Sequence, residues 1–206
     1  MQTLTRHILG VAGLALLASA SVAWAQGGPP VRVRATIEKV DGNTLTVKSK
    51  SGETMIVKLA EPPRIAAMEK ASLDDIKEGS FIGVSAMPQP DGAQKAYAIH
   101  IFMDAQKGVV ADRFSDWDSR PGSTMTNANV ATSVTGKEGR ELLVKYKDGE
   151  KKVLVPADTI IAKYAPGSAA DLKVGAKVFV AAATKNADGT LTAPNVAVGR
   201  SIDPPQ

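Results

Sequence analysis

Apolar and polar residues alternate along several short stretches of the chain. In the stretch 44–48, Leu45 and Val47 fall on one side and the polar residues on the other, which is the period-two pattern of a half-buried β-strand. The stretch 31–40 alternates in the same way, and the Asp-Gly-Asn sequence at 41–43 is typical of a tight hairpin turn. The pattern therefore predicts a β-rich protein that begins with a hairpin.

The same signals recur at a nearly constant spacing, 96 or 97 positions later in the chain. The matched positions are Val47 and Val144, Gly52 and Gly149, Asp75 and Asp171, Gly79 and Gly175, and Asp91 and Asp188. One spacing that holds over so many positions indicates an internal duplication. The sequence predicts two homologous modules of about 70 residues each.

Each module has the same expected order of elements. In the first copy a third strand at 54–59 is followed by a short helix, which Ser72 begins as a cap and Gly79 ends. Two strands at 81–87 and 95–102 complete the module. Five strands with a helix between the third and fourth is the order of an OB-type barrel. We expect an all-β chain of two tandem small five-stranded OB-like β-barrels, although another small barrel or sandwich would give similar periodicity.

These patterns divide the chain into six segments. The predicted division is a signal peptide at 1–25, a flexible tail at 26–30, a first barrel at 31–103, a linker at 104–129, a second barrel at 130–200 and a flexible tail at 201–206.

The amino terminus has the three parts of a secretory signal peptide. A short polar start is followed by an apolar run at 8–20 and by small residues around Ala25, where we expect cleavage. The run is shorter than the roughly 20 residues that span a bilayer. The chain has a net charge of +4 and no cysteine, which excludes disulfides and thiolate chemistry. We expect a periplasmic protein with no membrane span after the leader is removed.

One segment of the linker carries a family resemblance. Trp117-Asp118 is followed by Pro-Gly-Ser-Thr-Met-Thr-Asn-Ala at 121–128. Together with the tandem barrel pattern, this resembles a family of exported bacterial proteins classed under a domain of unknown function. The resemblance covers most of the chain after the leader. Some members are named as metal-transport components, but the resemblance implies a fold and no settled activity.

The candidate metal ligands are His100 and Met103. A histidine and a thioether suit Cu(I) or Ag(I), and His100 is the one histidine after the leader. The two residues are three positions apart on an expected strand, so their side chains should point to opposite faces, and methionine also fills cores. A packing role is the alternative for both residues.

The linker offers a second candidate site at Asp116, Trp117 and Asp118. Its aspartates superficially suggest Ca²⁺ ligation, but the glycine and glutamate of an EF-hand loop are missing. A solvated linker is the alternative to ligation, and docking of Trp117 into the groove between the barrels would give this segment a structural role.

The leading functional hypothesis is a non-catalytic secreted module that binds a periplasmic protein or a small ligand. The duplicated positions include no shared reactive residue, and no nucleophile motif is present, so we expect neither an enzyme nor a cofactor. One alternative is a periplasmic soft-metal protein that binds copper or silver. A second is an oligonucleotide- or polyanion-binding OB-type protein, although no nucleic-acid partner is expected in this compartment.

Overall fold

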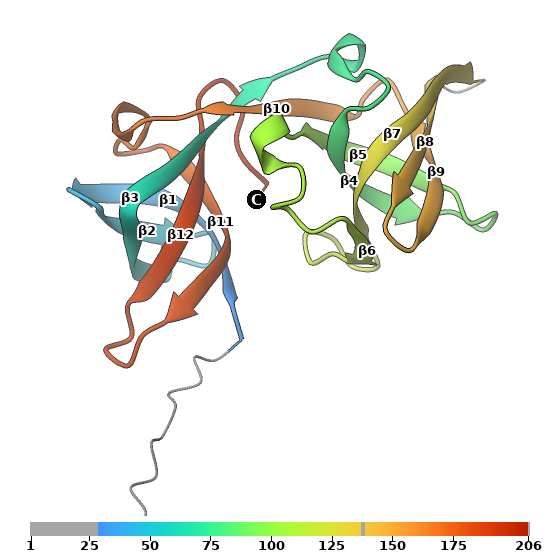
Figure 1. Ribbon diagram of the computed structural model, residues 1–206. Coiled ribbons are helices and arrows are strands. Elements are labelled where there is room, and N and C mark those ends of the chain that lie inside the picture. The colour runs from blue at the N-terminus through green and yellow to red at the C-terminus, as the bar shows by residue number, and fades with distance from the viewer. Residues whose placement is uncertain (1–28, 137–138, 206) are drawn as a thin grey trace, which may run out of the picture.

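The computed structural model describes residues 29–136 and 139–205, and in this part of the chain the protein is all-β. The predicted signal peptide lies outside the described residues. Figure 1 shows two lobes of strands that are joined by two strands crossing between them.

The first lobe is a closed five-stranded barrel. Its strands are β1 (Val31–Asp41), β2 (Thr44–Ser49), β3 (Thr54–Lys70), β11 (Lys177–Lys185) and β12 (Leu191–Gly199). Strand β1 lies between β2 and β11, and both neighbours are antiparallel to it. The barrel closes through parallel pairing of β12 with β3, from Leu191 opposite Val57 to Gly199 opposite Met68.

The second lobe repeats this order of pairing. Its strands are β4 (Phe81–Pro88), β5 (Gln94–Ile101), β7 (Thr124–Gly136), β8 (Gly139–Tyr146) and β9 (Gly149–Val155). Strands β4 and β7 are antiparallel neighbours, and β5 meets β9 in parallel at Gln94 opposite Val153 and Lys95 opposite Leu154. We call these five strands the second ring.

The strand pairing differs from the expected division into barrels at 31–103 and 130–200. The first barrel takes β1, β2 and β3 from the first half of the chain but β11 and β12 from the second. The second ring takes β7, β8 and β9 from the second half but β4 and β5 from the first. The two halves have therefore exchanged their last two strands, and neither half forms its lobe alone.

The exchange occurs because the chain crosses to the other lobe after the third strand of each half. The expected strand at 54–59 continues as β3 to Lys70, and its second part pairs antiparallel with β10 (Ile160–Pro166). Met68 lies opposite Tyr164, and the repeat spacing of 96 makes these two residues equivalents. A pseudo-two-fold axis therefore passes between them and relates the two lobes.

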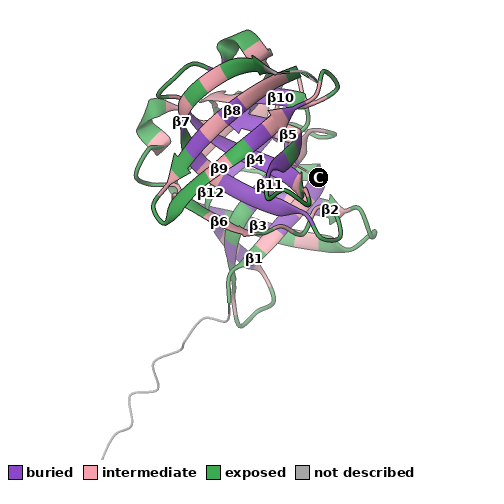
Figure 2. Ribbon diagram, turned by 90° about the vertical axis from the view of Figure 1, so that its right-hand side faces the viewer, coloured by how far each residue is buried: buried purple, intermediate pink, exposed green. Residues whose placement is uncertain are grey.

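Each lobe encloses its own apolar core. Leu45 and Val47 are buried in the first barrel, and Leu142 and Val144 are buried in the second ring, as the alternation predicted. Figure 2 shows buried positions alternating with exposed ones along these strands. Each such side chain contributes about 1.5–3 kcal/mol to folding through burial. Burial in the cores therefore stabilises each lobe, but it does not determine which half of the chain supplies which strands.

The two expected helices are single 3-10 turns, η1 (Leu73–Asp75) and η3 (Ala169–Asp171). The predicted cap is present: the backbone N–H and the hydroxyl of Ser72 both donate to Asp75, at 2.7 and 2.9 Å. The turn ends at Ile76 and not at Gly79 as predicted; Gly79, with a φ of +79°, lies in a separate turn that follows. The stretch between Ser72 and Gly79 is short, so the few hydrogen bonds that a helix could form there cannot offset the cost of helix nucleation.

The linker and the carboxyl-terminal tail are more ordered than expected. Within 104–129 the chain forms η2 (Asp104–Gln106), β6 (Arg113–Asp116) and the start of β7. The tail folds back onto the molecule, where the Ser201 hydroxyl accepts the backbone N–H of Lys70 at 2.9 Å and Asp203 pairs with Lys177 at 2.6 Å. In the described part of the chain no helix is long and apolar enough to cross a membrane.

Candidate functional site

The linker is fastened to the first barrel through Trp117 and Asp118. Arg32 and Arg34 are two residues apart on β1, so their side chains leave the same face of the strand. The Asp118 carboxylate accepts from Arg32 at 3.0 Å and from Arg34 at 2.6 Å. The two guanidinium carbons lie 4.6 and 5.2 Å from the centre of the Trp117 ring. The structure thus brings two predicted residues together on two arginines that the sequence did not single out.

The negative charge of Asp118 is paired with Arg32 and Arg34. The hydrogen bond from Arg34 is the largest influence and, with that from Arg32, lowers the pKa of Asp118 from 3.8 to about 2 despite partial burial. Asp116 lies at the exposed end of β6, opposite Thr124 of β7. The contacts of Asp118 fit a fastening role better than Ca²⁺ ligation.

Trp117 packs where the first barrel meets the crossing strands. Its ring meets that of Phe179 edge-on, with centroids 6.5 Å apart. The same apolar cluster includes Met68 from β3, Ala162 from β10 and Ile202 from the tail. The indole Nε1 is buried and has no hydrogen-bond partner among the described residues. Packing and the stacked arginines therefore hold this side chain in place against the first barrel and the crossing strands.

His100 lies inside the molecule, 7% exposed, on β5. Its ring centroid is 6.4 Å from that of Tyr164, which in turn stacks on Phe102 at 5.2 Å. Burial lowers the pKa of His100 from 6.5 to about 4 and raises that of Tyr164 to about 12. Both rings are therefore uncharged at neutral pH, and His100 behaves as part of an aromatic cluster.

Met103 follows β5 and precedes η2, where its backbone N–H donates to Gln106 at 2.9 Å. None of the ring contacts or hydrogen bonds between described residues joins Met103 to His100. Over the same residues, no three side chains among His, Cys, Asp and Glu gather as a metal site would require. The two predicted ligands are thus not brought together by any contact the structure describes.

A cleft of about 390 Å³ lies beside the crossing strands. One wall is the chain from Lys70 to Leu73, as it leaves β3, and the other is the turn at 156–159 with the first residues of β10. Ile202 of the tail also lines it. Ile160, which faces the cleft, is 53% exposed, while Lys70 and Asp158 supply opposite charges. The volume is in the range of small-ligand sites, which are mostly apolar with a few polar groups.

The pseudo-two-fold axis relates this cleft to a place that is tightly packed. At the cleft, the N–H of Ala71 donates to the carbonyl of Ile161 at 3.0 Å; at the related place, Gly167 donates to Ile65 at 3.1 Å. A Cβ added to Gly167 would lie 2.8 Å from Cγ2 of Ile65. The crossing segments are therefore hydrogen-bonded on both sides of the axis, but the surrounding atoms pack closely on one side and leave the cleft on the other.

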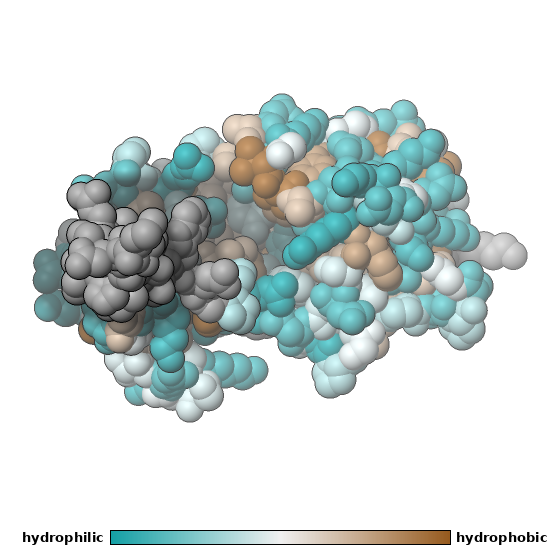
Figure 3. Space-filling model, turned by 60° about the horizontal axis from the view of Figure 1, so that its bottom comes forward, coloured by the Kyte–Doolittle hydropathy of each residue, from teal (hydrophilic) through white to brown (hydrophobic). Residues whose placement is uncertain are grey.

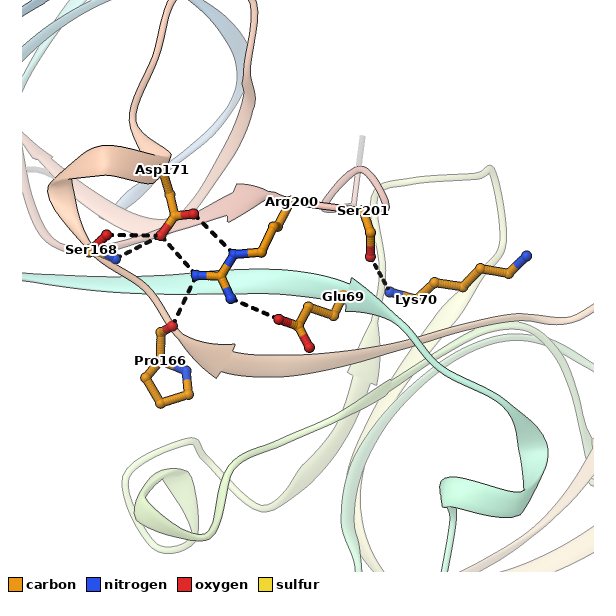
Figure 4. A network of polar contacts seen from close by, with 7 residues as sticks. All are labelled: Glu69, Lys70, Pro166, Ser168, Asp171, Arg200 and Ser201. Atoms are coloured by element: carbon orange, nitrogen blue, oxygen red, sulfur yellow. Dashed lines mark hydrogen bonds and ion pairs between the residues drawn. The ribbon is translucent and has the colours of Figure 1, made fainter.

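Arg200 reinforces the packed side. Its guanidinium donates to Asp171 at 2.9 and 3.0 Å, to Glu69 at 2.7 Å and to the carbonyl of Pro166 at 3.2 Å. Figure 4 shows these contacts drawing β3, β10 and η3 together, while the Lys70 side chain points away from them. The position of Pro166 is taken by Lys70 at the cleft, so the two sides differ in chemistry as well as in packing.

The outer face of the first barrel offers little for base stacking. The outward residues of β2 and β3 are Thr46, Lys48, Thr54, Ile56 and Lys58. By contrast, Phe81 and Phe179 are buried, as predicted for core aromatics. Figure 3 shows a largely hydrophilic surface with small apolar patches near the hollow between the lobes. The barrel face therefore lacks the aromatic platform that single-stranded nucleic acids use.

The cleft was missed because its walls lie in segments that show no strand pattern. Pro62-Pro63 interrupts the alternation of β3, and the turn at 156–159 precedes β10. One signal could have found them: the 12 residues between the expected strand end at Leu59 and Ser72 are long for a connection within a small barrel. A crossing strand is the natural way to use that length.

Compared with family models, with curated proteins and with solved structures, the chain matches none.

Proposed function

We propose that this protein is a non-catalytic binding module of the periplasm, and that it holds a compact ligand in the cleft beside the crossing strands. The ligand has a mostly apolar body and a polar end. The observation that carries the proposal is the cleft itself: about 390 Å³ of space between Lys70–Leu73 and the start of β10, at a place whose pseudo-symmetric counterpart is filled. The signal-peptide pattern of residues 1–25 supports the compartment.

The lining favours a ligand that is neither purely apolar nor highly charged. Ile160, Ile161, Leu73 and Ile202 supply apolar surface. Burial of this surface is the main source of affinity for a small ligand, at about 25 cal/mol per Å² of apolar area. Lys70 and Asp158 lie at the same cleft, so the polar end of the ligand meets one positive and one negative group.

A binding role is supported over catalysis or soft-metal binding by the state of His100. An imidazole that acts as a general base or as a metal ligand must be reachable by substrate or metal. His100 instead packs beside Tyr164 at 7% exposure. The polyanion alternative has less support, because the outward side chains of β2 and β3 include no aromatic ring.

We infer further that both lobes are OB-type barrels. In each lobe the first strand lies between the second and the fourth, and the third strand meets the fifth in parallel. This is the strand order of the OB fold, with the fourth and fifth strands supplied by the other half of the chain. The inference supports a binding role, since the OB fold commonly serves binding.

The proposal is tested with the fluorescent anion 1-anilinonaphthalene-8-sulfonate, which has an apolar body and one charged end. The protein is expected to bind the probe saturably, at one equivalent per chain. Ile160→Asp should weaken binding at least about tenfold, since it places a charge in the apolar lining. Lys70→Gln should weaken it and Asp158→Asn should strengthen it, because the probe is an anion.

Ile56→Asp is the matched control. Ile56 is also a strand isoleucine and is 43% exposed, but it lies on the outer face of the first barrel. This variant should bind the probe as the parent does. Equal loss in the Ile56 and Ile160 variants, or no saturable binding to the parent protein, would overturn the proposal.

A further inference from the structure

The two halves of the chain complete each other through strand edges. Strands β1 and β3 of the first half pair with β11 and β12 of the second. Strands β4 and β5 of the first half pair with β7 and β9 of the second. Unpaired strand edges are strong templates for pairing with another chain. Each half therefore carries a surface whose partner is the opposite half, and that partner can come from any copy of the chain.

A short segment of the linker determines whether the two halves meet within one chain. It is the stretch 107–112, between η2 and β6. Gly108 has a φ of +76° there, and Val109 is 73% exposed. The reversal is held by contacts local to the turn, among them the N–H groups of Val109 and Val110 donating to the carbonyl of Gln106 at 3.1 and 2.9 Å. It is also held by two contacts to other segments: the Lys107 ammonium donates to Gly79 at 3.1 Å and the amide of Asn127 donates to Ala111 at 3.0 Å.

Strands β5 and β7 belong to the same ring, so the chain has to reverse its direction between them, and it does so in this segment. If it is extended instead, its six residues span about 20 Å, and the second half is carried away from its own first half. All strand pairings between the halves are then available to a second copy, while only the contacts of the turn itself are lost. Short hinge segments of this kind favour domain swapping.

We propose that two copies of this chain form a dimer by exchanging halves, with the hinge at 107–112. Each unit of the dimer contains the first half of one chain and the second half of the other. The monomer is favoured at low protein concentration, because a short tether gives the two halves an effective concentration on the order of millimolar. Refolding at high concentration favours the dimer.

The first test shortens the hinge. A variant without Gly108 and Val109 cannot make the reversal, so it should elute as a dimer in size-exclusion chromatography with light scattering. Its dimer fraction should exceed that of the parent at least about tenfold at equal concentration. A folded, hinge-shortened monomer would overturn the proposal.

The second test leaves the hinge intact and uses the absence of cysteine from the chain. Thr36 and Lys177 are opposite each other across β1 and β11. One chain receives Thr36→Cys and another Lys177→Cys, and the two are unfolded, mixed and refolded together at high concentration. Exchange predicts a disulfide-linked dimer of the two chains, and Thr36→Cys refolded alone is the control for random oxidation. Monomers without this cross-link, at a concentration where the parent refolds, would contradict the exchange even if the shortened variant failed to fold.

Discussion

The burial of His100 predicts a specific loss of stability in mild acid. The folded-state pKa is about 4, against 6.5 for an unperturbed histidine. Between pH 6.5 and pH 4 the unfolded chain binds a proton at this histidine that the folded chain does not. The stability that the protein has while His100 is neutral in both states is therefore fully present above about pH 6.5 and is lost as the pH falls toward 4. This difference in pKa corresponds to about 3 kcal/mol in all, most of which is lost between pH 7 and 4.5.

The carboxylates with a lowered pKa affect the stability of the protein in a different pH range. Asp118, Asp171 and Asp188 each have a pKa of about 2 instead of 3.8. Their contributions are present above about pH 4 and are lost as the pH falls from there to 2. Measurements between pH 7 and 4.5 therefore isolate the histidine.

The assay is urea unfolding at several pH values, followed by circular dichroism, for the parent protein and His100→Gln. Glutamine is uncharged throughout this range, so the variant should show a nearly flat free energy of unfolding from pH 7 to 4.5, even if it is less stable at pH 7. The parent should lose about 2–3 kcal/mol over the same interval. If both proteins declined in parallel, or if the parent did not decline, the reasoning from burial would be wrong.

Four further substitutions test the packing. Val144→Asp places an unpaired charge in the core of the second ring, where Val144 is fully buried, and should lower the free energy of unfolding by more than about 4 kcal/mol in urea titration. Gly167→Ala should cost about 1–3 kcal/mol, because its Cβ would lie 2.8 Å from Ile65, whereas the related change Ala71→Gly should cost less than about 1 kcal/mol. Trp117→Ala should cost about 2 kcal/mol or more through lost packing and lost cation–π contacts, and limited proteolysis should then cut the linker faster; an unchanged cutting rate would contradict the fastening role.

The local features of the fold could be read from the sequence because they depend on nearby residues. Alternation placed Leu45, Val47, Leu142 and Val144 in the cores. The repeat spacing predicts two separate barrels, whereas the strand pairing gives two lobes that share strands from both halves of the chain. Each of these signals depends on residues close in the chain or on a comparison of the chain with itself.

The exchange of strands could not be predicted in this way. The fourth strand of either half, β4 or β11, could pair equally well with the edge of β1, because the two strands have similar patterns of apolar and polar residues. The choice depends on where the chain goes after Leu59, and the segment up to Lys70 contains two prolines and no strand periodicity. Among the residues of the candidate site, Trp117 and Asp118 stand out in the linker sequence, but Arg32 and Arg34 look like ordinary outward residues of β1 until the linker is folded onto them.

The exchanged halves are the central claim, and one cysteine cross-link tests it most directly. Lys58 of β3 is opposite Thr192 of β12, whereas two separately closed barrels would set Lys58 opposite Lys95, the repeat equivalent of Thr192 at a spacing of 97. Two double variants are made in the same chain and oxidised as folded monomers. The exchange predicts a disulfide within the chain for Lys58→Cys with Thr192→Cys and none for Lys58→Cys with Lys95→Cys. A disulfide in the second variant and not in the first would contradict it.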